Sequence, residues 1–203
     1  MRIRSILLAA LSAGLLLSGL SRAIDSPNVR RLGATIGQYK DDAFQLAVSW
    51  RYPHLHPEER WTFFETWMMP IGKQGVTINR EDVSLFLPDG TRIPLPSQKK
   101  LMEGLPDIRR VAAIGDVARD PMEGYFVARN EIIRIGFQEI PGTFVTFDER
   151  GMASFWAAVG DLYFENPKGT WEKGIYTFSV KNKEVDAKIP MPIGITGDLE
   201  RVK

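Results

Sequence analysis

A regular alternation of apolar and polar side chains between Val83 and Leu95 predicts a β-hairpin. The first strand has apolar side chains at every second position, the period of a strand with one face on a core; these are Val83, Leu85 and Leu87. Pro88-Asp89-Gly90 follows. Proline presets φ, aspartate can hydrogen-bond its own backbone and glycine tolerates a positive φ, so the chain reverses here. Thr91, Ile93 and Leu95 then return along the first strand.

The segment from Trp61 to Met69 is compatible with a strand or with a helix. In a strand, one face carries Trp61, Phe63, Glu65, Trp67 and Met69, and the other carries Thr62, Phe64, Thr66 and Met68. A helix is suggested by Pro57, which suits the first helical position, and by the two glutamates after it, which suit the positive end of the helix dipole. Aromatic and β-branched residues dominate the run and a proline ends it, so the strand is the favoured prediction.

Further runs of period 2 predict a mainly β protein. They cover residues 44–50, several stretches after Tyr125, and residues 174–180 and 185–189. Pro190 and Pro192 mark the last strand as a sheet edge, because proline cannot donate to a ladder. After the hairpin, Ser97 and Asp107 can each cap a short helix. We therefore predict a helical insertion near residues 97–115 between the strands.

Several motifs point to one type of β fold. An aromatic strand is followed by a short polar link from Gly72 to Gly75, a Val-Thr-Ile strand end, and Asp82-Val83-Ser84-Leu85 before the Pro-Asp-Gly turn. This pattern resembles the early strands of immunoglobulin-like domains in bacterial secreted proteins of unassigned function. Gly174-Ile175-Tyr176 resembles the tyrosine corner of such domains, where the phenol bonds to an upstream backbone group. The resemblance implies an immunoglobulin-like antiparallel β-sandwich and brings no catalytic residues.

The N-terminus predicts a secretory signal peptide over residues 1–23. Arg2 and Arg4 precede an apolar run from Ile6 to Leu20, and Ser21-Arg22-Ala23 has small residues where a signal peptidase cleaves. The run is shorter than the roughly 20 apolar residues that cross a bilayer. We therefore expect no stable membrane insertion after cleavage and a periplasmic or secreted location. Residues 24–43 are predicted to be an extended lead-in, and residues 44–203 the β-sandwich domain.

Composition narrows the classes of partner. The chain has no cysteine, which excludes a lipid-anchored lipoprotein and any disulfide. It has 26 Lys+Arg and 25 Asp+Glu, and removing Arg2, Arg4 and Arg22 with the signal peptide leaves 23 basic residues. Nucleic-acid binding needs a basic surplus that this balance lacks. We predict no nucleic-acid partner.

Both histidines of the chain, His54 and His56, lie between Pro53 and Pro57. Two imidazoles one residue apart, with glutamates following, are the nearest approach to metal-ligand spacing in the sequence. Prolines on both sides predict a stiff exposed connection instead, and a third histidine is lacking. We predict no metal site and no cofactor, and these two histidines are the candidate ligands should a metal bind.

The polar residues 115–124 are predicted to form an exposed loop. Their charged side chains, Asp116, Arg119, Asp120 and Glu123, include both signs. Such a segment is typical of a solvated surface, and we prefer that interpretation to an active site.

Motifs of catalysis are lacking in the sequence. There is no cysteine nucleophile, no Gly-x-Ser-x-Gly elbow and no glycine-rich phosphate loop. A glycosidase needs only two carboxylates, which the chain has in plenty, so a carbohydrate-active protein that binds or hydrolyses a glycan is the alternative hypothesis.

The favoured hypothesis is an exported, non-catalytic binding or assembly module of the cell envelope. Its partner would be an envelope protein or a glycan. The chain has five tryptophans, and any that are exposed could stack on sugar rings or anchor a protein partner. Trp61 and Trp67 are the candidate ligand-binding residues.

Overall fold

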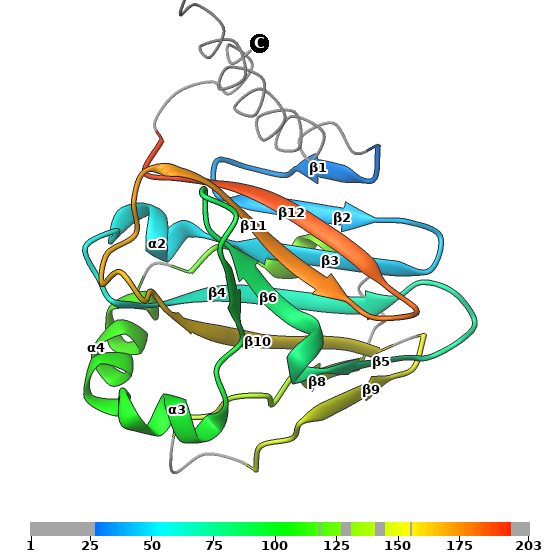
Figure 1. Ribbon diagram of the computed structural model, residues 1–203. Helices are drawn as coiled ribbons and strands as arrows, with labels where there is room; N and C mark the ends of the chain where they lie inside the picture. The colour runs from blue at the N-terminus through cyan, green and yellow to red at the C-terminus, as the bar shows by residue number, and fades with distance from the viewer. Residues whose placement is uncertain (1–26, 118, 127–130, 141–144, 155, 196–203) are drawn as a thin grey trace, which may run out of the picture.

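The structure is a computed structural model that describes residues 27–117, 119–126, 131–140, 145–154 and 156–195 (Figure 1). The predicted signal peptide, residues 1–23, lies outside this part of the chain. In the residues described, no helix has both the length and the apolar character needed to cross a membrane.

Strands dominate the described chain. They are β1 (Val29–Arg31), β2 (Ile36–Lys40), β3 (Phe44–Ser49), β4 (Trp61–Pro70), β5 (Val76–Asn79), β6 (Val83–Phe86), β7 (Arg92–Pro94), β8 (Glu131–Arg134), β9 (Glu149–Met152), β10 (Trp156–Glu165), β11 (Gly174–Lys181) and β12 (Asp186–Ile193). The helices are α2 (Arg51–Leu55), α3 (Gln98–Glu103) and α4 (Leu105–Gly115), with 3-10 turns η1 (Arg80–Asp82) and η2 (Met122–Tyr125). The prediction of a mainly β protein is confirmed, and α3 and α4 occupy the predicted insertion.

The described strands form three sheets. The largest has the order β1-β2-β3-β4-β10-β8, the second has the order β12-β11-β6-β7, and β5 pairs with β9. Pairing is antiparallel except between β8 and β10. The strand with Pro190 and Pro192, β12, lies at the edge of its sheet, as the prolines predict.

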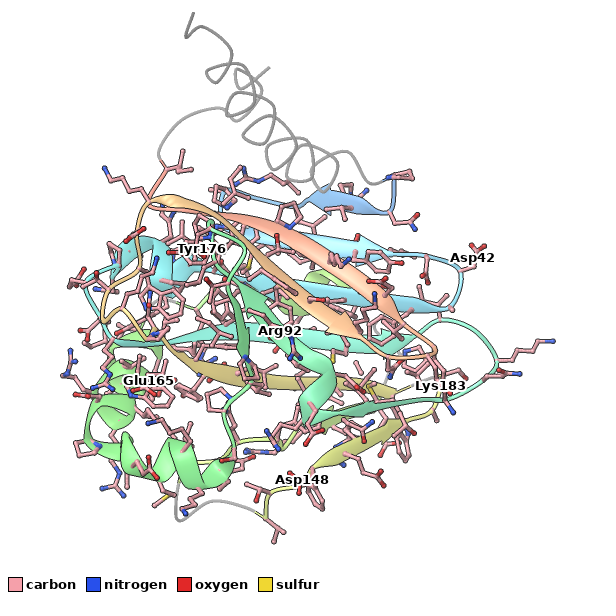
Figure 2. The ribbon with its side chains drawn as sticks, in the orientation of Figure 1. Asp42, Arg92, Asp148, Glu165, Tyr176 and Lys183 are labelled. Carbon is pink, nitrogen blue, oxygen red and sulfur yellow. The ribbon has the colours of Figure 1, made fainter. Side chains whose placement is uncertain are left out.

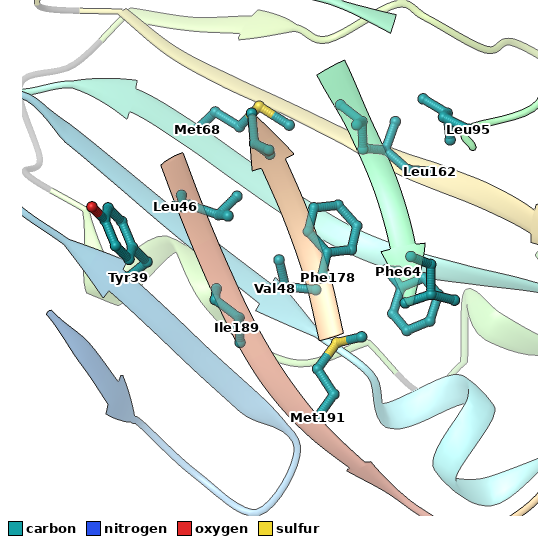
Figure 3. Close-up of a cluster of buried hydrophobic side chains, with 14 of the residues drawn as sticks. Tyr39, Leu46, Val48, Phe64, Met68, Leu95, Leu162, Phe178, Ile189 and Met191 are labelled. Atoms are coloured by element: carbon teal, nitrogen blue, oxygen red, sulfur yellow. The ribbon is translucent and has the colours of Figure 1, made fainter. Parts of the chain in front are cut away.

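The main hydrophobic core combines side chains of the two larger sheets. Figure 3 shows side chains of β3 and β4 gathered with those of β11 and β12. Phe64 of β4 and Phe178 of β11 are fully buried, and their ring centroids are 6.0 Å apart. Burying a side chain of this size contributes about 1.5–3 kcal/mol relative to leaving it exposed.

The strand β4 is buried on both faces. Its inner face contributes Phe64 to the main core. Its outer face, which points away from that core, contributes Trp61 and Phe63 to a second cluster with α3 and α4. Farther along the same face, Trp67 packs in a third cluster with Phe126. The prediction of a strand here, and not a helix, is confirmed.

The two helices begin close to the predicted positions. Ser97 is the N-cap of α3, where its side chain accepts a hydrogen bond from the amide of Lys100, as its position predicts. The second helix, α4, begins at Leu105 after the N-cap Gly104. Asp107 therefore lies in the first turn of α4 and does not cap it, although an acid there still suits the helix dipole.

Two glycines allow the helices to approach the outer face of β4 closely. A Cβ atom at Gly104 would lie 2.6 Å from the indole of Trp61, and one at Gly115 would overlap the ring of Phe63. Figure 1 shows α3 and α4 together at one end of the β4–β10 pair. The insertion is therefore a cover for this strand.

The two turn motifs of the sequence adopt the expected geometry. Gly90 in the hairpin has a φ of 84°, and the amide of Thr91 donates to the carboxylate of Asp89 at 2.9 Å. At the start of β11, the hydroxyl of Tyr176 donates to the carbonyl oxygen of Glu172 at 2.9 Å (Figure 2). This is the upstream backbone bond that the Gly-Ile-Tyr motif predicts.

The predicted lead-in is part of a sheet. Both β1 and β2 lie within residues 24–43, and β2 pairs with β3 in antiparallel register. A Cβ atom at Gly37 would lie 2.5 Å from Ile189 of the second sheet, so β2 is in close contact with β12. The sheet thus begins before the boundary predicted at residue 44, because the buried Gly37 and Gln38 hide the apolar alternation of β2.

Replacing Gly115 by alanine tests the packing of α4 on β4. The added methyl group would overlap the buried ring of Phe63, so we expect the free energy of unfolding to fall by about 1–3 kcal/mol in urea titrations. Gly124→Ala is the matched control, because a Cβ atom there meets nothing within 4 Å. Equal stabilities of the two variants would contradict this packing.

Candidate functional site

A pocket of about 1140 Å³ lies on the outer face of β4 and β10. Its described lining combines these two strands with parts of residues 116–124 and 134–140. The side chains that matter most for its chemistry are Glu65, Trp67, Arg119, Glu139, Asp161 and Tyr163. The volume is sufficient for a small organic ligand.

Glu65 is a buried acid in the lining of the pocket. Its residue is 9% exposed, and it pairs across the sheet with Asp161 of β10 on one side and Ser49 of β3 on the other. Burial raises the pKa of Glu65 to about 7, and the negative charges of Asp161 and Asp120 act in the same direction. The amide of Asp120, which donates to Glu65 Oε1 at 3.3 Å, and the charge of Arg119 oppose this rise.

Arg119 connects the loop after α4 to the sheet. It donates to both oxygens of Asp161, with Nη1–Oδ1 and Nη2–Oδ2 distances of 2.8 and 2.7 Å. Nη2 also donates to Asp116 Oδ1 at 2.9 Å, while Glu65 Oε2 is farther from the guanidinium, at 3.8 Å. These hydrogen bonds to carboxylates raise the pKa of Arg119, so its positive charge is permanent. The positive charge of Arg119 therefore stabilises an ionised Glu65 less than it stabilises Asp161 and Asp116.

Asp120 attaches the same loop on the β3 side of β4. Its Oδ2 accepts hydrogen bonds from Thr35 Oγ1 at 2.9 Å and Ser49 Oγ at 2.7 Å, and its Oδ1 accepts one from Arg51 Nη1 at 3.2 Å. The side chain of Asp120 is 7% exposed, and Met122 is also buried. The prediction of a solvated loop over residues 115–124 is therefore wrong at these positions, because the loop packs on the outer face of β4.

Two aromatic side chains, Trp67 and Tyr163, line the pocket. Trp67 is partly buried and lines the pocket, and its ring lies 5.0 Å from the ring of Phe126 with an interplanar angle of 30°. Near the other end, Tyr163 of β10 packs on Phe63 in the cluster beneath α4. The pocket therefore has an indole beside a set of fixed polar groups.

The described lining is acidic overall. Its acids outnumber its bases; they are Glu65, Asp116, Asp120, Glu123, Glu139 and Asp161 against Arg119 and Arg134. Arg134 Nη1 lies 3.6 Å from Glu139 Oε1, which adds a second charged pair at the rim. Such a surface offers many hydrogen-bond acceptors to a polar ligand.

The two tryptophans predicted to bind a ligand have different surroundings. Trp67 lines the pocket, as described above. Trp61 is 2% exposed and lies against Gly104 beneath the helices, although it is on the same face of β4. The exposure that stacking requires is met at Trp67 and not at Trp61, because the helical insertion covers the first half of the strand.

The predicted histidine loop is partly helical. Residues 51–55 form α2, in which Pro53 is buried while Leu55 is exposed, so this segment is only in part the exposed connection that its prolines suggest. His54 Nδ1 lies 3.3 Å from the carbonyl oxygen of Pro192, and His56 Nδ1 lies 3.5 Å from Glu58 Oε1. Among the residues that the structure describes, no three His, Cys, Asp or Glu side chains are grouped to hold a metal. The absence of a metal site stays a prediction.

The sequence gives one signal for the charged cluster. Glu65 is the single ionisable residue on a face of β4 that is otherwise apolar. Its neighbours Asp161, Arg119 and Asp120 come from segments far along the chain, and no local pattern brings them together. Its own charges alone therefore make the polar stretch from 115 to 124 look like exposed surface.

Comparison of the chain with protein-family models, with curated proteins and with solved structures finds no match. Inferences about function therefore rest on the geometry of the pocket and on the sequence.

Replacing Asp120 by asparagine tests whether this side chain fastens the loop. The new amide group cannot accept all three hydrogen bonds from Thr35, Ser49 and Arg51, so we expect the free energy of unfolding to fall by about 2–3 kcal/mol. Asp116→Asn is the control: it also removes one carboxylate charge next to Arg119, but its side chain is 66% exposed, and we expect a change within about 0.5 kcal/mol. Equal losses in the two variants, measured by chemical denaturation, would contradict this assignment.

Proposed function

We propose that the protein is an exported, non-catalytic binding module of the cell envelope whose ligand enters the pocket on the outer face of β4 and β10. The observation that carries the proposal is the partly exposed Trp67 beside fixed polar groups in a pocket of about 1140 Å³. Ligand sites in proteins commonly combine an apolar or aromatic wall with a few placed polar groups.

The shape and chemistry of the pocket favour a glycan over a protein partner. A sugar ring presents an apolar face that can stack on an indole and hydroxyl groups that can donate to carboxylates. Both kinds of group are present here, on Trp67 and on Glu139 and Asp161. A hollow of this kind suits one or a few sugar residues, whereas protein partners typically use larger surfaces.

Export is supported by the N-terminal sequence alone. The basic start, the apolar run and the small residues before position 24 are those of a secretory signal peptide. The near-balance of charge after residue 23 also argues against a nucleic-acid partner. A glycan of the envelope is a ligand that an exported module would meet.

We also infer an immunoglobulin-like sandwich for the two larger sheets. The strand orders β3-β4-β10-β8 and β12-β11-β6-β7 correspond to the A-B-E-D and G-F-C-C′ orders of such domains. The hydrogen bond of Tyr176 at the entry of β11 supports the same assignment. Two features depart from the pattern, namely the added β1 and β2 and the parallel pairing of β8 with β10.

Replacing Trp67 by alanine tests the proposed stacking. We expect glycan affinity to fall by about 2 kcal/mol, roughly 30-fold in Kd, because truncating a central aromatic anchor typically has this effect. The measurement is isothermal titration calorimetry against a panel of envelope oligosaccharides.

Trp67→Phe is the matched variant, because a phenyl ring keeps a stacking face and the contact with Phe126. It should retain most of the affinity. Glycan binding that Trp67→Ala leaves unchanged would contradict the site. If no oligosaccharide of the panel binds, and the protein instead captures an envelope protein through Trp67, then the ligand is a protein partner and not a glycan.

A second candidate function, glycan hydrolysis, is favoured by one observation. Glu65 and Asp161 are cross-strand neighbours in the pocket, and the pKa of Glu65 is raised to about 7 while Asp161 is paired with a permanent cation. A neutral acid beside an ionised carboxylate is the combination that glycosidases use.

Binding is preferred because the two hydrogen bonds from Arg119 make Asp161 a poor nucleophile, while its oxygens can still accept a further hydrogen bond from a hydroxyl group. Release of reducing sugar from any oligosaccharide of the panel distinguishes the two functions. Turnover that Glu65→Gln and Asp161→Asn each abolish, while calorimetric binding persists, would make the protein a hydrolase.

A further inference from the structure

Residues 119–126, here called the strap, cross the outer face of β4 and border the pocket. Polar contacts hold the first part of the strap, through Arg119 to Asp161 and through Asp120 to Ser49. The second part is held by apolar contacts of Met122 and Phe126 in the cluster with Trp67. The strap therefore has one ionic and one apolar attachment.

The ionic attachment has more acids than bases. The groups around Glu65 of β4 are Asp161 from β10, Arg119 and Asp120 from the strap, Asp116 from the end of α4, and Arg51 from the start of α2, which reaches the cluster through Asp120. β3 contributes the uncharged Ser49. The remaining charged lining residues are Glu139 and Arg134, which pair with each other, and the exposed Glu123.

Two guanidinium groups thus face three aspartates before Glu65 is counted. An ionised Glu65 would add a fourth negative charge at a residue that is only 9% exposed. It could gain little from Arg119, whose Nη1 is 3.8 Å away and already donates to Asp161 at 2.8 Å. Burying such a charge without a close partner is unfavourable.

We propose that the strap is a pH-responsive cover of the pocket, held against the sheet while Glu65 is protonated and loosened when Glu65 loses its proton. This inference does not depend on what the pocket binds. It concerns the strap and the ionic attachment only, because the apolar contacts of Met122 and Phe126 do not titrate.

The sign of the effect follows from the environment of Glu65 in the two states. With the strap in place the pKa of Glu65 is about 7, and with the strap lifted into water it returns toward the ordinary value of about 4.5. The closed form therefore binds the proton more tightly. Opening is least favourable below pH 4.5, becomes more favourable as pH rises toward 7, and levels off above that.

Amide hydrogen exchange of residues 119–126, measured on the full chain between pH 4.5 and 8, tests the inference. Glu65→Gln keeps the size and the neutral state of the protonated acid at every pH. The rate in the unaltered protein is divided by the rate in Glu65→Gln at the same pH, which cancels the intrinsic pH dependence of exchange. We expect this ratio to rise at least about tenfold, because each unit of pKa difference is a factor of ten in the opening equilibrium.

Two further variants separate titration of Glu65 from general loss of charge. Glu123→Gln removes an acid from the strap itself, but this residue is exposed, and its exchange should follow that of the unaltered protein. Asp161→Asn removes a like charge and frees Arg119 to pair with Glu65, so the rise of exchange with pH should be smaller and should level off at a lower pH.

A ratio that stays constant between pH 4.5 and 8 would overturn the inference. Should Glu65→Gln not fold, the ¹³C resonance of the Glu65 carboxyl group in the unaltered protein gives an independent answer. Titration of that carboxyl group below pH 5 would overturn the inference equally, and titration near pH 7 together with faster exchange of the strap would support it.

Discussion

Burial of β4 on both of its faces is the interaction on which the other features of this protein depend. The inner face supplies Phe64 to the main core, and the outer face supplies Trp61 and Phe63 to the cluster beneath α3 and α4. Each aromatic side chain removed from water contributes about 1.5–3 kcal/mol. An uncovered outer face would lose these contributions, and the segment after the hairpin folds back over the strand to provide the cover.

The cover changes character at the middle of the strand. Glu65 interrupts the apolar face between Phe63 and Trp67. The covering segment contacts Glu65 through Arg119 and Asp120, which are polar. Burial raises the pKa of Glu65, and the opposing charge of Arg119 is shared with two aspartates. A polar pocket lies beside this acid. The proposed ligand site and the proposed response to pH both arise from this one buried acid.

Local patterns in the sequence predict much of this fold and little of its site. Alternation predicts β4 and the hairpin, the Pro-Asp-Gly turn predicts the reversal at Gly90, and the motif before Tyr176 predicts a bond that the structure contains. The sequence does not reveal the pairing of β4 with β10 or of β6 with β11, since partners far apart in the chain are chosen by the whole core. The cluster around Glu65 depends on that choice and is hidden with it.

Hydroxyl-radical footprinting with mass-spectrometric readout tests the double burial of β4 most directly, because it reports side-chain exposure on each face. Protection is the ratio of labelling in the unfolded chain to labelling in the native protein. Trp61 and Phe63 on the outer face should be protected as strongly as Phe64 on the inner face, whereas Met102, which is 40% exposed on α3, should be labelled readily. Labelling of Trp61 and Phe63 with no more protection than Met102 would contradict the account.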